Sequence, residues 1–96
     1  MNKVILIGRA GKDPEISPAK SLVVRISLAT TEWKKDTGQY SEWHRLVMFE
    51  KVADRAMKFI KKGTLLAIEG KIRTSRYTDK DGEEKISTEI ICHEMS

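Results

Sequence analysis

The sequence has little that would cross-link the chain or carry it through a membrane. Cys92 is the only cysteine, so no disulfide can form within one chain, and we expect a reducing compartment. The longest apolar run near the amino terminus covers residues 4–7, far short of the roughly 20 residues that span a bilayer. No signal-peptide pattern accompanies it. We therefore expect a cytoplasmic protein with no membrane partner.

The patterns of enzymes, metal proteins and cofactor proteins are also missing. The turn at residues 8–14 has glycines and a lysine, but its spacing is not that of a phosphate-binding P-loop. Residues 79–84 lack the frame of a calcium loop and indicate a hairpin turn instead. His44, Cys92 and His93 do not form a zinc-ligand pattern, because adjacent strand residues face opposite ways. We expect no catalytic residue, no metal and no cofactor.

The charge is uneven along the chain. Lys and Arg number 18 and Asp and Glu 14, giving a net charge of +4. Through Arg76 the chain has 16 basic and 8 acidic residues, whereas the last 20 residues have 2 basic and 6 acidic. A basic body is what a polyanionic partner requires, although many soluble proteins also have basic patches.

The length of 96 residues fits a single domain over residues 1–96. Apolar alternation predicts strands, and apolar residues at helical spacing predict one helix that ends at Gly63. The expected strands cover residues 3–8, 21–31, 41–51, 66–77 and 85–92, with the helix at about 52–60. Three strands, a helix and two strands indicate an all-β fold with one short helix, a five-stranded Greek-key oligonucleotide-binding (OB) barrel.

The strand at residues 41–51 concentrates the most informative side chains. Trp43, Arg45, Val47 and Phe49 alternate onto one face, and Lys51 follows at the same spacing. Aromatic rings in one row with cations can stack bases and neutralise phosphates. The alternative is that Trp43 and Phe49 are simply barrel core. We favour nucleic-acid binding.

Seven segments, in this order, connect the chain to a known family: Asn2–Gly8, Gly11–Glu15, Ser27–Glu32, Glu42–Arg45, Lys61–Gly63, Ile68–Gly70 and Ser87–Ile91. With these segments the chain resembles the bacterial-type single-stranded DNA-binding proteins. The resemblance implies an OB barrel with its helix between the third and fourth strands. It also implies a homotetramer built as a dimer of dimers. The implied function is to bind and protect single-stranded DNA, without sequence preference, in replication, recombination and repair. The implied location is close to the bacterial nucleoid.

The resemblance also implies roles for single residues. The stacking aromatics of the family correspond to Trp33, Trp43, Phe49 and Tyr77. Its cations that contact the DNA backbone correspond to Arg45, Lys51, Lys62 and Arg73. Its subunit interface corresponds to Val4, Ile5, Leu6 and His44. For Lys62, attraction to the negative end of the helix dipole is an equal explanation.

The sequence departs from the family in three respects. Tyr77 lies where the family often has Trp, and a tyrosine offers a smaller stacking face. The hairpin between Trp33 and Trp43 is shorter than is common in the family, and the chain stops at Ser96 without the flexible linker and acidic tip of typical members. Replication and repair proteins are therefore expected partners only if a tail exists in the native protein. The alternatives are a short accessory subunit of the primosomal type and an OB subunit that prefers RNA.

Overall fold

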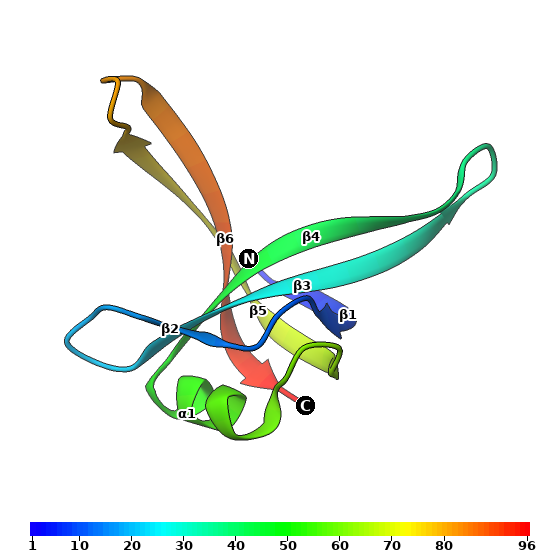
Figure 1. The fold of residues 1–96 in the computed structure, drawn as a ribbon, viewed down its shortest axis with the longest axis horizontal. Helices are drawn as coiled ribbons and strands as arrows, with labels where there is room; N and C mark the ends of the chain where they lie inside the picture. The colour runs from blue at the N-terminus through cyan, green and yellow to red at the C-terminus, as the bar shows by residue number, and fades with distance from the viewer.

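The computed structural model describes all 96 residues as a barrel closed at one end by a helix (Figure 1). The elements are β1 (Val4–Ala10), β2 (Glu15–Ser17), β3 (Val23–Lys34), β4 (Gly38–Phe49), α1 (Glu50–Phe59), β5 (Leu65–Thr78) and β6 (Glu84–Met95). The strand order is β1-β5-β6-β4-β3-β2, and a further pairing of β1 with β3 closes the barrel. All pairings are antiparallel except that of β4 with β6. No helix is both long and apolar enough to cross a membrane.

The predicted fold class is confirmed: five long strands form the barrel, with α1 between the third and the fourth. The sixth strand, β2, was not predicted, because three residues are too few to show a period. The expectation that Lys51 continues the row of β4 is wrong, since β4 ends at Phe49 and Lys51 lies in the first turn of α1. The same two-residue spacing extends across the boundary, so the pattern could not reveal the change.

The core forms where the apolar alternation of the long strands meets one side of α1. Its buried residues are Ala10, Val24, Ile26, Leu28, Leu46, Met48, Ala53, Ala56, Ile60, Leu66, Ile68, Ile90, Cys92 and Met95. The inward residues of β3 and β4 are almost fully buried, whereas α1 contributes mainly the small side chains of Ala53 and Ala56. Small residues let the helix approach the barrel end closely.

Two long hairpins project from the barrel in different directions (Figure 1). One is formed by β3 and β4, which pair without interruption from Val23 and Phe49 to Lys34 and Gly38. The other is formed by β5 and β6, and the Asp79 side chain orders its turn by accepting two backbone N–H bonds. The pairing of β5 with β6 shifts register between Glu69 and Gly70.

Candidate nucleic-acid interface

Trp43 lies on the outer face of β4, with its side chain 62% exposed. Its six-membered ring packs against Gly11 in the connection between β1 and β2, so closely that a Cβ at Gly11 would overlap the ring. Gly11 in turn donates its backbone N–H to the carbonyl oxygen of Ser27 at 2.8 Å. The tryptophan is therefore held against a fixed support while much of its surface remains open to solvent.

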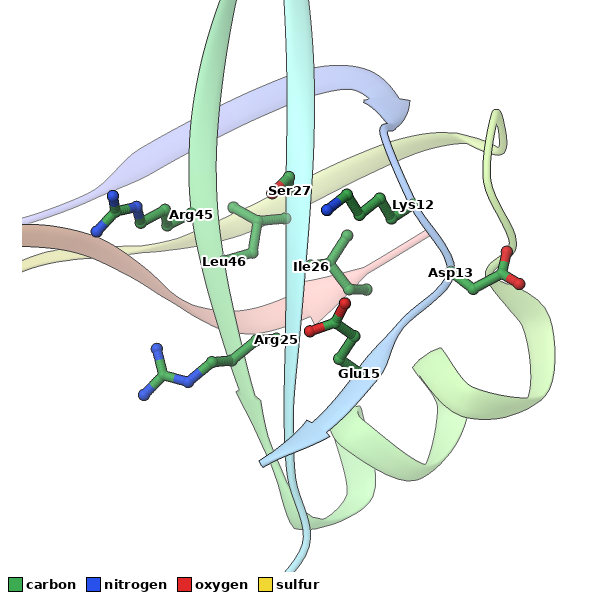
Figure 2. Close-up of a pocket in the computed structure, with 8 residues that line it drawn as sticks. All are labelled: Lys12, Asp13, Glu15, Arg25, Ile26, Ser27, Arg45 and Leu46. Atoms are coloured by element: carbon green, nitrogen blue, oxygen red, sulfur yellow. The ribbon is translucent and has the colours of Figure 1, made fainter. Parts of the chain in front are cut away.

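An open hollow of about 210 Å³ lies at Arg45, two residues farther along β4 (Figure 2). Its lining residues are Lys12, Asp13, Glu15, Arg25, Ile26, Ser27, Arg45 and Leu46. Figure 2 shows Arg25 and Arg45 extending in the same direction from neighbouring strands, while Lys12 reaches toward β3 from the β1–β2 connection. Lys12 and Ser27 also line a second recess beside Trp43, so the two hollows adjoin at these residues.

Of the two acidic residues that line the hollow, Asp13 is hydrogen-bonded within the protein. Asp13 accepts the backbone N–H of Lys62 at 2.7 Å, which ties the β1–β2 connection to the segment after α1. Arg45 donates to the Ser87 hydroxyl on β6 at 3.2 Å, using one of its five N–H groups. The hollow therefore presents cationic N–H donors toward solvent, which suits an anionic ligand.

A buried carboxylate lies farther along the same face. Glu89 on β6 is only 7% exposed, and its two oxygens accept hydrogen bonds from Arg25 on β3 and Arg73 on β5. Burial raises the pKa of this carboxyl group, but the hydrogen bonds from Arg25 and Arg73 outweigh burial and hold the pKa below its ordinary value. Glu89 is therefore ionised at neutral pH and links three strands.

The other predicted aromatics are exposed but do not converge on Trp43. Trp33, 75% exposed, lies near the tip of the β3–β4 hairpin, and Tyr77 lies half-exposed on the β5–β6 hairpin. Phe49, 37% exposed, ends β4 at the opposite end of the barrel. A nucleic-acid strand that contacted all four rings would have to follow both hairpins.

The predicted cations are likewise divided. The structure brings Arg45 to the hollow and Arg73 to Glu89, whereas Lys51 lies on α1 and Lys62 follows it. Arg25 and Lys12 belong to the hollow and were not predicted. The signal for Arg25 was available, because it alternates onto the face of β3 opposite the core residues Val24 and Ile26.

The predicted interface residues of β1 separate by face. Val4 and Leu6 pack partly buried against the core, whereas Ile5 and the unpredicted Ile7 point outward and are exposed. His44 is half-buried, and its Nε2 lies 2.8 Å from the Thr30 hydroxyl. The outer face of β1 is therefore apolar and uncovered in the single chain.

Comparison with known proteins decides the family, because the Single-strand binding protein family matches residues 1–96, the whole chain. The chain belongs to this family. It is 42% identical to the single-stranded DNA-binding proteins of Xanthomonas campestris pv. campestris and Xanthomonas axonopodis pv. citri, in each case over 99% of this chain. The chain spans only 59% and 56% of the lengths of those relatives. Membership of a family of binding proteins agrees with the expectation that the chain is not an enzyme.

A solved structure supports the same assignment. The chain superimposes on a Plasmodium falciparum SSB in complex with ssDNA with a TM-score of 0.87 and 30% identity, covering 100% of this chain and 91% of the other. The OB barrel and the position of its helix are thus those of this family.

Proposed function

We propose that this member of the Single-strand binding protein family binds single-stranded DNA without sequence preference, by stacking bases on aromatic rings and pairing phosphates with Lys and Arg. The observation that carries the proposal is the position of Trp43, which is 62% exposed beside a cationic hollow instead of being buried in the core. Family membership and the structural likeness to an SSB in complex with ssDNA support it.

Stacking supplies affinity without sequence choice, because every base has a flat face. Each stacked base contributes roughly 1–3 kcal/mol. Trp43 is the central stacking residue in this mechanism, and Trp33 and Tyr77 extend the path along the two hairpins. Duplex DNA is a poor ligand because its bases are already stacked on one another.

Phosphate contacts supply the remainder of the affinity and its salt dependence. Arg45 and Lys12 line the hollow beside Trp43, so a backbone that passes Trp43 meets both. Phe49, Lys51 and Lys62 lie at the α1 end of the barrel and serve a strand that continues beyond the hollow.

Assembly as a homotetramer is also part of the proposal. Residues Val4–Gly8 of β1 pair with β5 on one edge only, and the exposed side chains of Ile5 and Ile7 lie on the outer face. An unpaired strand edge with an apolar face is suited to pairing with a second copy. The proposal extends to roles in replication, recombination and repair in the bacterial cytoplasm and to contacts with proteins of those processes, and its support here is family membership alone. Native mass measurement tests the assembly, and a monomer would contradict it.

The test of binding is a titration with a thymidine oligomer, monitored by tryptophan fluorescence and by anisotropy of a labelled oligomer. We expect quenching on binding, and weaker binding by about 5- to 150-fold for Trp43→Ala, the equivalent of one stacked base. Arg45→Gln should instead lower the slope of log K against log salt by about 0.7, the value of one phosphate contact.

Matched duplex and uridine oligomers complete this test. Wild-type binding to the duplex as strong as to the thymidine oligomer would refute the proposal. Stronger binding to the uridine oligomer would favour an RNA-binding function instead.

A further inference from the structure

Glu89 is the only buried charged residue of the chain. Charged side chains are almost never fully buried in proteins unless they are paired. Its carboxylate accepts one hydrogen bond from Arg25 and another, at 3.3 Å, from Arg73. Arg25 is 64 residues away along the chain and Arg73 is 16 away. The cluster therefore exists only because β3, β6 and β5 are folded together.

The sheet register places this cluster on the same face as Arg45. Arg25 pairs with Val47, two residues beyond Arg45 on β4, and Val47 pairs with Ile91, two residues beyond Glu89 on β6. Residues two apart on a strand share a face. The cluster is thus a continuation of the hollow, in which Arg25 itself takes part.

Both guanidinium groups are hydrogen-bonded within the protein, and both keep free N–H donors. Arg25 uses two of its five N–H groups, one toward Glu89 and one toward the Ser17 hydroxyl at 3.0 Å. Arg73 uses one. Both side chains remain nearly half exposed, and the cluster keeps a net charge of +1. Free donors on two fixed guanidinium groups match the oxygens of a phosphate.

Stability alone is a weak reason for such a cluster. Taking a carboxylate out of water costs several kcal/mol, and ion pairs of this kind are often replaced by apolar residues without loss of stability. Orientation of the two arginines is a use that apolar residues cannot replace.

We propose that Arg25 and Arg73 form a phosphate subsite for the backbone of the bound strand, and that Glu89 is the positioning residue that aims both guanidinium groups. The proposal rests on the proposed function, and it adds Arg25 and Glu89 to Arg73, which the family resemblance already assigns to the DNA backbone. The ligand is a phosphodiester of single-stranded DNA.

The first test is Arg25→Gln, measured as a salt titration of thymidine-oligomer binding. Loss of one phosphate contact should lower the slope of log K against log salt by about 0.7. Lys58→Gln is the matched control, because it removes the same charge from an exposed ion pair with Asp54 on α1 and should leave the slope unchanged. Equal slopes for wild type and Arg25→Gln would overturn the subsite.

The second test is Glu89→Gln, for which charge and positioning predict opposite results. The substitution removes one negative charge from the face, which by itself would tighten binding. A glutamine side chain has one acceptor oxygen, so it cannot hold both arginines as the carboxylate does. We expect weaker binding and a slope lower by about 0.7 to 1.4, the value of one or two phosphate contacts.

Asp54→Asn, which removes the same negative charge from α1, is the control for Glu89→Gln. Unchanged or tighter binding by a folded Glu89→Gln would overturn the positioning role. Should that variant fail to fold, Arg25→Lys keeps the charge without the planar fork and should weaken binding; wild-type affinity for it would overturn the same role.

These outcomes are separable from failure of the proposed function. If the wild type does not bind the oligomer at all, the proposed function fails. If the wild type binds, and Trp43→Ala weakens it while Arg25→Gln does not change the slope, only the subsite fails.

Discussion

Replacing Gly11 with alanine tests whether the protein positions Trp43 through its backbone. The added Cβ would overlap Cζ3 of the Trp43 ring and lie 2.9 Å from Cη2. The backbone at residue 11 cannot easily withdraw, because its N–H is bonded to the carbonyl oxygen of Ser27. The indole ring is the more mobile group, so we expect the ring to move.

The expected magnitude follows from the stack that the ring would lose. One base stacked on an aromatic ring contributes roughly 1–3 kcal/mol, so Gly11→Ala should weaken binding of a thymidine oligomer by up to about 150-fold. Stability should change little, because glycine to alanine at a compatible backbone position stabilises by about 0.4–1 kcal/mol, which offsets the local displacement. Urea unfolding measures this second quantity.

Anisotropy of a labelled thymidine oligomer reports the affinity, and the emission of Trp43 in a Trp33→Phe background reports the movement of the ring. Trp43→Ala serves as the reference, since Gly11→Ala should have no further effect once the ring is gone. Two results would refute the reasoning: unchanged affinity and emission in Gly11→Ala, or an equal loss of affinity when the substitution is made in the Trp43→Ala background.

Three further predictions concern stability and reactivity. Glu50 begins α1 with a φ of 51°, a conformation that costs a non-glycine residue about 1–2 kcal/mol. The Glu50→Gly variant should therefore unfold at a higher urea concentration than Glu50→Ala, although alanine is the better helix former of the two. Burial raises the pKa of the Cys92 thiol to about 12, so a thiol reagent at pH 8 should label the native protein far more slowly than the protein in urea, and equal rates would contradict the burial. The pKa of Glu89 is lowered in the folded state, so ionised Glu89 stabilises the fold at pH values above its ordinary pKa of 4.5, and this stabilisation is lost as the pH falls through the lowered pKa. In this acid range, the stability of Glu89→Gln measured by urea unfolding should therefore depend less on pH than the stability of the wild type.

The fold could be predicted because its signals are local. Alternation along β3 and β4 separates Ile26, Leu28, Leu46 and Met48 from the outward residues, and the structure buries all four. The start of α1 was missed because its N-cap is Phe49, which makes no capping hydrogen bond from its side chain and gives none of the usual Ser, Thr, Asp or Asn signal.

The site was less predictable because its contacts join distant parts of the chain. The exposure of Trp33, Trp43 and Tyr77 agrees with their expected position on the surface. The support of Trp43 by Gly11 and the pairing of Arg25 with Glu89 depend on which strands become neighbours, and no spacing in the sequence records that.

The outer face of β4 changes character along its length, and this determines where each kind of contact can act. At Trp43 the face is open, whereas Val47, four residues farther on, is only 1% exposed although it points away from the core side of the strand. The register places Val47 between Arg25 on β3 and Ile91 on β6, beside the Glu89 carboxylate. Charges over an apolar, poorly hydrated floor interact more strongly than charges in open water. A phosphate should therefore be held most tightly near Arg25, which pairs with Val47 at one end of this face, and bases should be stacked at the open end near Trp43. The DNA backbone and the bases are then bound at different positions along the outer face of β4.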